Sequence, residues 1–216
     1  MWQRQEIQEV LWEMIRPYDF GIGPIVYCEL GKNNSFPNPP CGKCLRWDKL
    51  KKNGYHWRYV IGPDTGGEAL LIPIRVLYCR RCHKVTYILP SFCVPRKQHT
   101  VLAFESFFLY LFFTKLSLTE VVERARRIKS SYQLAQAWIK SFRNNVVNLT
   151  AEVRTIMKVT DHNASCYRYM ELSSLWWSMQ RLADNLSHQF PGMLPLERVQ
   201  FTLMQKRRLS LFSYIA

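Results

Sequence analysis

The sequence lacks a hydrophobic run long enough to cross a membrane. Its most apolar stretch, residues 101–113, includes Glu105 and falls short of the roughly 20 apolar residues that a bilayer-spanning helix needs. The first residues also lack the form of a secretory signal, since apolar residues recur at helical spacing between Ile7 and Ile15. We therefore expect a cytoplasmic protein without a membrane partner. Residues 2–16 are predicted to form an amphipathic helix ended by Pro17, and residues 101–113 a buried helix.

Acidic residues are scarce relative to basic ones. The chain of 216 residues has 16 Asp and Glu against 30 Lys and Arg, which gives a formal net charge of +14. Residues 41–100 hold 12 of the basic residues and only 3 acidic ones. A surface this basic repels itself unless it meets a polyanion, and this favours nucleic acid as the partner.

The chain has seven cysteines. This odd number argues against a secreted disulfide framework, in which the cysteines are paired. Four of them form two C-x-x-C pairs, with Cys41 and Cys44 in CGKC and Cys79 and Cys82 in CRRC. Structural Zn²⁺ sites hold four ligands in a tetrahedron, and four thiolates are a common set. The two pairs therefore predict one structural zinc ion bound by these four cysteines. The remaining cysteines are expected to be core thiols: Cys28, Cys93 and Cys166.

The 34 residues between Cys44 and Cys79 have the pattern of an inserted β-hairpin. Segments rich in aromatic and β-branched residues, 55–61 and 69–79, flank the turn sequence GPDTGG at 62–67. Doubling a loop costs only about 0.6 kcal/mol in closure entropy, against the roughly 10–16 kcal/mol that zinc supplies in small fingers. A thioredoxin-like redox site fits less well, because it has one C-x-x-C at the start of a helix. Four thiolates leave the metal no open position for catalysis.

The predicted zinc ribbon offers basic and aromatic side chains to a ligand. Cationic groups contact phosphates, and aromatic rings stack on bases. Trp57 and Tyr59 either join this surface or form the small core of the ribbon, while His83 is expected to be a polar surface residue. The candidate nucleic-acid-binding residues of the ribbon are Lys43, Arg58, Arg80, Arg81 and Lys84.

Residues 116–146 have the pattern of two short helices joined by a turn. Ser117 or Thr119 can cap the first helix, and Ser130 or Ser131 the second. Apolar residues recur at helical spacing over 134–142, which leaves a polar face on the second helix. Such a pair suits insertion into the DNA major groove, although any packed helical hairpin gives the same periodicity. The candidate DNA-contacting residues are Arg126, Arg127, Lys129, Ser131, Tyr132, Gln133, Gln136 and Lys140.

Several motifs together resemble a known group of proteins. PCGKC is followed by IPIRVLYCRRCHKVTYILPSFCVPRKQHT, then by LSLTEVVERA and YQLAQAWIKSF. This order resembles the transposon-associated zinc-ribbon and helix-turn-helix proteins of Firmicutes, and more broadly the N-terminal DNA-binding region of bacterial insertion-sequence transposases. The shared features are R-x-x-x-C-x-x-C from Arg75 to Cys82, Leu89-Pro90, and W-x-x-x-F from Trp138 to Phe142. The resemblance covers residues 40–145 and implies site-specific binding of element or promoter DNA, with nucleoid association.

The resemblance does not extend to catalysis. Transposases of the common type use three carboxylates that hold divalent metal, whereas only five acidic residues follow residue 146, in a stretch with little strand character. We therefore expect an accessory or regulatory DNA-binding factor of a mobile element, without its own catalytic site. One alternative is an RNA- or single-strand-binding subunit of a larger nucleoprotein complex. Another is an unrecognised nuclease or transposase fragment.

The expected fold is α+β and mostly α. It comprises an N-terminal helix and loop (1–39), a four-cysteine zinc ribbon with a β-hairpin (40–99), a helix-turn-helix domain (100–162) and a C-terminal helical region (163–216). In the last region an amphipathic helix is predicted over 167–190, followed by a further segment at 194–212. These helices either pack on the helix-turn-helix layer or bind a protein partner, including a second copy of the chain.

Overall fold

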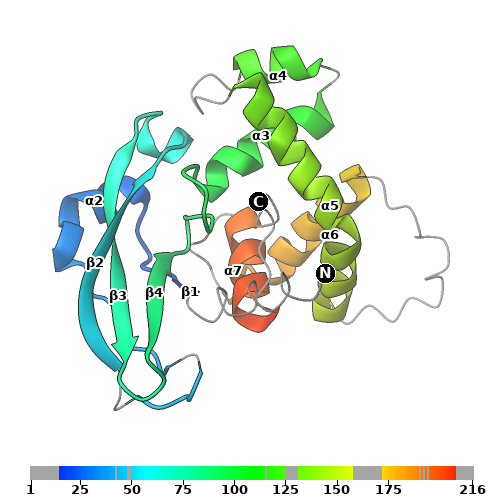
Figure 1. Ribbon diagram of the computed structural model, residues 1–216. Coiled ribbons are helices and arrows are strands. Elements are labelled where there is room, and N and C mark those ends of the chain that lie inside the picture. The colour runs from blue at the N-terminus through cyan, green and yellow to red at the C-terminus, as the bar shows by residue number, and fades with distance from the viewer. Residues whose placement is uncertain are drawn as a thin grey trace.

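The computed structural model describes residues 15–41, 43–47, 50–114, 116–124, 131–157, 172–189, 191, 193 and 195–207. Within these ranges the predicted α+β class is confirmed: a four-stranded sheet lies beside a group of helices (Figure 1). The described helices include none that combines the length and apolar character needed to cross a bilayer.

The sheet has the strand order β1-β4-β3-β2. Strands β2 (Leu50–Val60) and β3 (Leu70–Cys79) are antiparallel and form the hairpin predicted around residues 62–67. A short turn of residues 80–83 then leads to β4 (Lys84–Pro90), which is antiparallel to β3. The alternating sequence of β4 carries a strand signal that the sequence analysis did not use.

Strand β1 (Ile15–Tyr18) corrects the prediction for the N-terminal region. It runs parallel to β4, with Ile15 opposite Tyr87 and Pro17 opposite Leu89. Ile15 and Arg16 are therefore not the end of a helix, and Pro17 lies within a strand. β1 is an edge strand, where a proline without an N–H is tolerated. Residues 2–14 of the expected helix lie outside the described ranges.

The segment after β1 packs against the sheet through aromatic side chains. Helix α2 (Pro24–Leu30) begins with a proline, whose fixed φ suits the first helical position, and the short 3-10 helix η1 (Gly31–Asn33) follows it. The ring of Tyr27 lies 4.9 Å from Phe20, and Phe36 lies 5.6 Å from Tyr55 on β2. The Tyr27 hydroxyl also donates to the Pro73 carbonyl at 2.8 Å. The sheet layer thus extends across the predicted boundary at residues 39 and 40.

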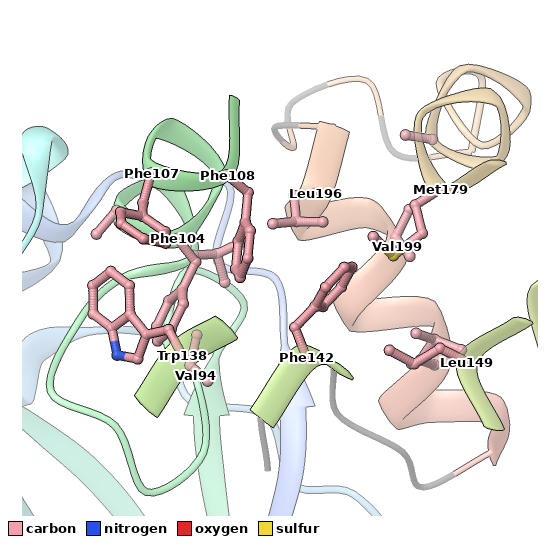
Figure 2. Close-up of a cluster of buried hydrophobic side chains, with 14 of the residues drawn as sticks. Val94, Phe104, Phe107, Phe108, Trp138, Phe142, Leu149, Met179, Leu196 and Val199 are labelled. Carbon is pink, nitrogen blue, oxygen red and sulfur yellow. The ribbon is translucent and has the colours of Figure 1, made fainter. Parts of the chain in front are cut away.

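The described helices of the second half share one hydrophobic core. They are α3 (Val101–Phe113), α4 (Leu118–Arg124), α5 (Tyr132–Met157), α6 (Leu172–Asn185) and α7 (Pro195–Arg207). Helix α3 confirms the predicted buried helix. Figure 2 shows Phe142 of α5 pointing toward Leu196 and Val199 of α7. The buried side chains of Met179 and Leu182 on α6 belong to the same core, so these two pack internally.

Helix α5 is longer than expected. It runs to Met157, well past the predicted end near residue 146. Residues 147–157 contain neither glycine nor proline, so nothing in the local sequence stops the helix. Buried Leu149 adds this extension to the core.

Thr100 joins the sheet to the helices. Its main-chain N–H donates to the Ile61 carbonyl at 2.9 Å, and its hydroxyl donates to Asp64 Oδ1 at 2.6 Å. The same side chain caps α3 by accepting from the Ala103 N–H at 3.4 Å. Adjacent His99 places its ring 4.8 Å from Trp138 of α5. These contacts fix the start of α3 to the end of the β2–β3 hairpin.

Candidate metal centre and nucleic-acid surface

The two C-x-x-C segments fold into matching turns. In each, the residue after the second cysteine has a left-handed backbone, with φ of 56° at both Leu45 and His83. In each, the N–H of that residue donates at 2.9 Å to the carbonyl of the first cysteine, Cys41 or Cys79. A left-handed residue allows such a tight turn, and glycine adopts this conformation most easily. The same local geometry therefore recurs at both ends of the hairpin, although neither turn has a glycine at this position.

The sheet brings these two turns together. The first turn leads into β2, where Leu50 pairs with Cys79 at the end of β3, and the second turn connects β3 to β4. The 34-residue insertion is thus the β2–β3 hairpin, as predicted, and its two ends meet at the cysteines. Cys41 and Cys79 are buried, and Cys44 and Cys82 are half-buried.

The four sulfur atoms have the spacing of a metal-binding group. All of them lie within 4.8 Å of one another. Cys41 Sγ is 3.9 Å from Cys82 Sγ, and Cys44 Sγ is 3.7 Å from Cys79 Sγ. A tetrahedron with metal–sulfur bonds of about 2.3 Å separates its sulfurs by about 3.8 Å. These cysteines are therefore suited to a structural metal site.

The electrostatics of the cluster also suit a cation. The main-chain N–H of Arg46 lowers the pKa of the Cys44 thiol to about 7. Hydrogen bonding to the Cys44 sulfur, followed by burial, raises the pKa of Cys82 to about 12. Neighbouring thiolates repel one another, so protons are retained among the sulfurs. A divalent cation at the centre would displace them, because a coordinating thiol loses its proton.

Described residues outside the cluster match several further predictions. His83 is exposed, and its Nδ1 lies 2.6 Å from the Tyr78 hydroxyl, as befits a polar surface residue. Cys93 is buried, and burial raises its pKa to about 12. Cys28 is half-buried beside the Leu71 carbonyl. Cys166 lies outside the described ranges.

Most of the basic candidates of this region lie on the surface near the cluster. Lys43, Arg80 and Arg81 are exposed on the two cysteine turns, and Lys84 is half-buried at the start of β4. Arg58 behaves differently, because its guanidinium donates to the main-chain carbonyls of Val94 and Lys97. The structure therefore gives Arg58 a role in holding the loop that follows β4.

The aromatic side chains of the hairpin divide between surface and core. Trp57 is 45% exposed and Tyr59 is 53% exposed, so the interpretation that placed them in a small ribbon core is wrong. Trp47, beside the first cysteine turn, is 61% exposed. Tyr55 is half-buried, with the guanidinium of buried Arg75 4.7 Å from its ring centre.

Two of the predicted helix caps are present at α4 and α5. The Ser117 hydroxyl accepts from the Glu120 N–H at 3.3 Å, and the Ser117 N–H donates to the Glu120 carboxylate at 2.7 Å. This reciprocal pair is a capping box. At α5, Ser131 Oγ accepts from the Leu134 N–H at 3.2 Å.

The predicted division of α5 into two faces is also observed. Trp138 and Phe142 are buried against α3, with the ring of Trp138 4.2 Å from Phe104. The polar candidates on the other face are exposed: Ser131, Tyr132, Gln133, Gln136 and Lys140. Candidates Arg126, Arg127 and Lys129 lie outside the described ranges.

One basic segment of the sheet region is absent from the predicted site residues. Arg96 and Lys97 lie in the loop between β4 and α3, beside the exposed hairpin residues Trp57 and Tyr59. Their adjacent charges in the sequence PRKQ were a visible signal. Their position beside β2 depends on hydrogen bonds that a charge count does not reveal.

Comparisons of this chain with known protein families, with characterised proteins and with solved structures find no match. The features of this chain that bear on its function are therefore the geometry of the cysteine cluster, the exposed face of α5 and the distribution of charge.

Proposed function

We propose that this chain is a zinc-dependent, sequence-specific duplex-DNA-binding protein that acts as an accessory or regulatory factor of a mobile genetic element. The observation that carries the proposal is the capped start of α5, where buried Trp138 and Phe142 fix the helix and leave Gln133 and Gln136 exposed. Glutamine reads adenine edges in the major groove, and each good bidentate contact is worth about 1–3 kcal/mol of discrimination.

In this proposal, α4 and α5 act as a helix-turn-helix. The first turns of α5 enter the major groove, and the basic residues before and within it contact the flanking phosphates. Lys140 lies one turn beyond Gln136 on the exposed face and is placed to meet the backbone. Phosphate contacts set the register and the base contacts set the sequence preference.

The cysteine cluster is proposed to hold one Zn²⁺ as the structural centre of a zinc ribbon. Thiolate ligands in a tetrahedral set favour zinc among the common divalent ions. Exposed Lys43, Arg80 and Arg81 on the cysteine turns would then add phosphate contacts away from α5. The role is one of binding, with catalysis supplied by other proteins, and the link to a mobile element rests on the resemblance of residues 40–145.

A second candidate function is binding of RNA or single-stranded DNA. The exposed rings of Trp47, Trp57 and Tyr59 favour it, because unpaired bases stack on such rings at about 1–3 kcal/mol each. Duplex DNA is the better supported ligand, since the exposed α5 residues include side chains suited to reading base edges.

The two candidates are separated by substitution. The native protein should bind a duplex selected from a random pool more tightly than a random duplex. When Gln133 and Gln136 are both replaced by Ala, this ratio of affinities should fall by about tenfold or more. A matched control replaces the exposed α6 pair Arg181 and Asp184 by Ala, and should leave discrimination unchanged. Fluorescence anisotropy measures both. If the Gln pair has no effect while Trp57→Ala abolishes binding, the groove-reading proposal is wrong and the aromatic surface is the interface.

A further inference from the structure

A cavity of about 460 Å³ lies on the sheet, and its lining includes no residue of the cysteine cluster or of α5. Strands of the sheet form its floor, and the loop of residues 95–98 forms one wall. Small-molecule sites in proteins commonly have volumes of roughly 300–1,000 Å³. The cavity is therefore large enough for a small ligand, and no part of the function proposed above uses it.

The floor is apolar and aromatic. His56 is paired across the strands with Ile74, and Ile15 is paired with Tyr87, so the members of each pair point to the same face of the sheet. The rings of His56 and Tyr87 lie 6.0 Å apart and nearly perpendicular. Trp57 also borders the cavity, but its side chain points to the other face of the sheet, where Lys32 Nζ lies 5.7 Å from its ring centre, so the aromatic groups of the floor are His56 and Tyr87. This arrangement suits a flat, aromatic ligand.

The charged groups that line the cavity all have the same sign. They are Arg58, Arg96 and Lys97, and the described lining contains no carboxylate. Half-buried Lys97 has its pKa lowered by burial and then by the neighbouring charge of Arg96. Positive charge that is partly removed from water without a carboxylate beside it favours an anionic ligand.

The wall of the cavity is held in place before any ligand arrives. The Arg58 guanidinium donates to the carbonyls of Val94 and Lys97, and the Ile61 N–H donates to the Gln98 carbonyl at 2.8 Å. Arg96 has a left-handed backbone with φ of 60°, which turns the loop back toward the sheet. Preorganised loops lose less entropy on binding a ligand.

We propose that this cavity binds a single unpaired nucleotide, with its base against the aromatic floor and its phosphate at Arg96 and Lys97. A nucleotide combines the two properties that the lining selects, a flat aromatic part and a negative charge. The nucleotide is either free in solution or an unstacked position in a DNA strand, such as an overhang. This site goes beyond duplex binding through α5 and does not require it.

The first experiment is isothermal titration calorimetry of the zinc-loaded full chain with the four deoxynucleoside monophosphates. The controls are inorganic phosphate, which has only the anionic part of the proposed ligand, and deoxyadenosine, which has only the base and sugar. At least one mononucleotide should bind about tenfold more tightly than either control, because the two parts are held together. If no mononucleotide binds better than phosphate alone, the proposal is wrong.

Matched double variants test the location. Arg96→Asn with Lys97→Gln removes two charges from the wall, and asparagine tolerates the left-handed backbone. Lys51→Gln with Lys52→Gln removes two exposed charges elsewhere on β2. The first pair should weaken mononucleotide binding about tenfold or more, and the second less than about twofold. Equal losses in both would overturn the location, and thermal melting checks that both variants fold.

A short duplex with a one-nucleotide overhang, compared with its blunt form, identifies the source of the nucleotide. Tighter binding of the overhang, lost in the Arg96/Lys97 double variant, assigns a strand end to the cavity. Mononucleotide binding without an overhang effect assigns a free nucleotide. Retained blunt-duplex binding in that double variant keeps this test separate from the function proposed for α5, because an unchanged sequence preference after Gln133 and Gln136 are replaced by Ala would refute only the latter.

Discussion

Gly62 is predicted to be a position at the sheet–helix junction where even one methyl group is costly. Its backbone is extended, with φ of −177° and ψ of −178°, so alanine would adopt the conformation without strain. The cost is steric, because an added Cβ would overlap Thr100 Oγ1 and Asp64 Oδ1. Thr100 would have to turn away, breaking its 2.6 Å hydrogen bond to Asp64 and its cap on α3.

The magnitude follows from those two interactions. A hydrogen bond to a charged group is worth about 1.5–3 kcal/mol, and loss of an N-cap costs about 0.5–2 kcal/mol. Gly62→Ala should therefore lower the free energy of unfolding by about 2–5 kcal/mol. Gly23→Ala is the matched control, because an added Cβ there meets no atom within 4 Å. It should change stability by less than about 0.5 kcal/mol.

The assay is urea unfolding of zinc-loaded protein, followed by circular dichroism. The decisive comparison repeats Gly62→Ala in a Thr100→Ala background, where the obstructing hydroxyl is gone and the Asp64 carboxylate has lost the hydrogen bond that holds it against Gly62, so that it can turn aside. There the additional cost should fall below about 1 kcal/mol, since interacting residues show non-additive effects. A cost that is the same in both backgrounds, or one as small as that of Gly23→Ala, would refute the packing argument.

Three further changes give distinct outcomes. Cys79→Ser should reduce bound zinc from about one to well below one per chain and destabilise the sheet, because it removes one of the four ligands. The control Cys28→Ser lies outside the cluster and should retain its zinc. Metal analysis measures both. Arg58→Met should cost about 2 kcal/mol and speed amide exchange in the 94–98 loop, since two main-chain carbonyls lose a charged donor. Burial raises the pKa of Glu105 to about 7, so the folded state keeps this proton more strongly than the unfolded chain. Glu105 therefore stabilises the fold most below about pH 4.5, and this stabilisation is lost as the pH rises through 7. The free energy of unfolding of Glu105→Gln, relative to that of the native protein, should increase by about 2–3 kcal/mol between pH 5 and pH 8.

Each of these outcomes can contradict its premise. Normal zinc content in Cys79→Ser would remove this residue from the ligand set. Unchanged exchange in the Arg58→Met loop would show that other contacts hold the wall of the cavity. A parallel pH dependence of Glu105→Gln and the native protein would show that Glu105 titrates alike in the folded and unfolded chains.

The features predicted from the sequence depend on signals between close neighbours. The C-x-x-C pairs place two sulfurs on one turn, the GPDTGG turn joins two β-rich segments, and serines stand where α4 and α5 begin. The gathering of the four cysteines follows once the hairpin is recognised, because antiparallel pairing returns the chain to its starting point.

The features that were missed depend on contacts between distant segments. Parallel pairing of β1 with β4 joins residues about seventy positions apart. Pro17 lies in β1, but a proline after an apolar helical pattern also predicts the end of a helix. The cavity wall depends on hydrogen bonds from Arg58 of β2 to main-chain carbonyls of the loop after β4. Local sequence patterns do not predict hydrogen bonds between segments so far apart. The end of α5 was also missed, since its extension is stabilised by packing of Leu149 in the shared core.

The most direct test of duplex recognition is fluorescence anisotropy of the zinc-loaded chain on duplex DNA, single-stranded DNA and structured RNA over a range of salt concentrations. Duplex DNA should bind most tightly, and its log Kd should rise with log salt with a slope of about 4 or more, which corresponds to roughly five neutralised phosphates. Tighter binding of single strands or RNA, or a duplex affinity that is insensitive to salt, would contradict duplex recognition through α5 and the basic cysteine turns.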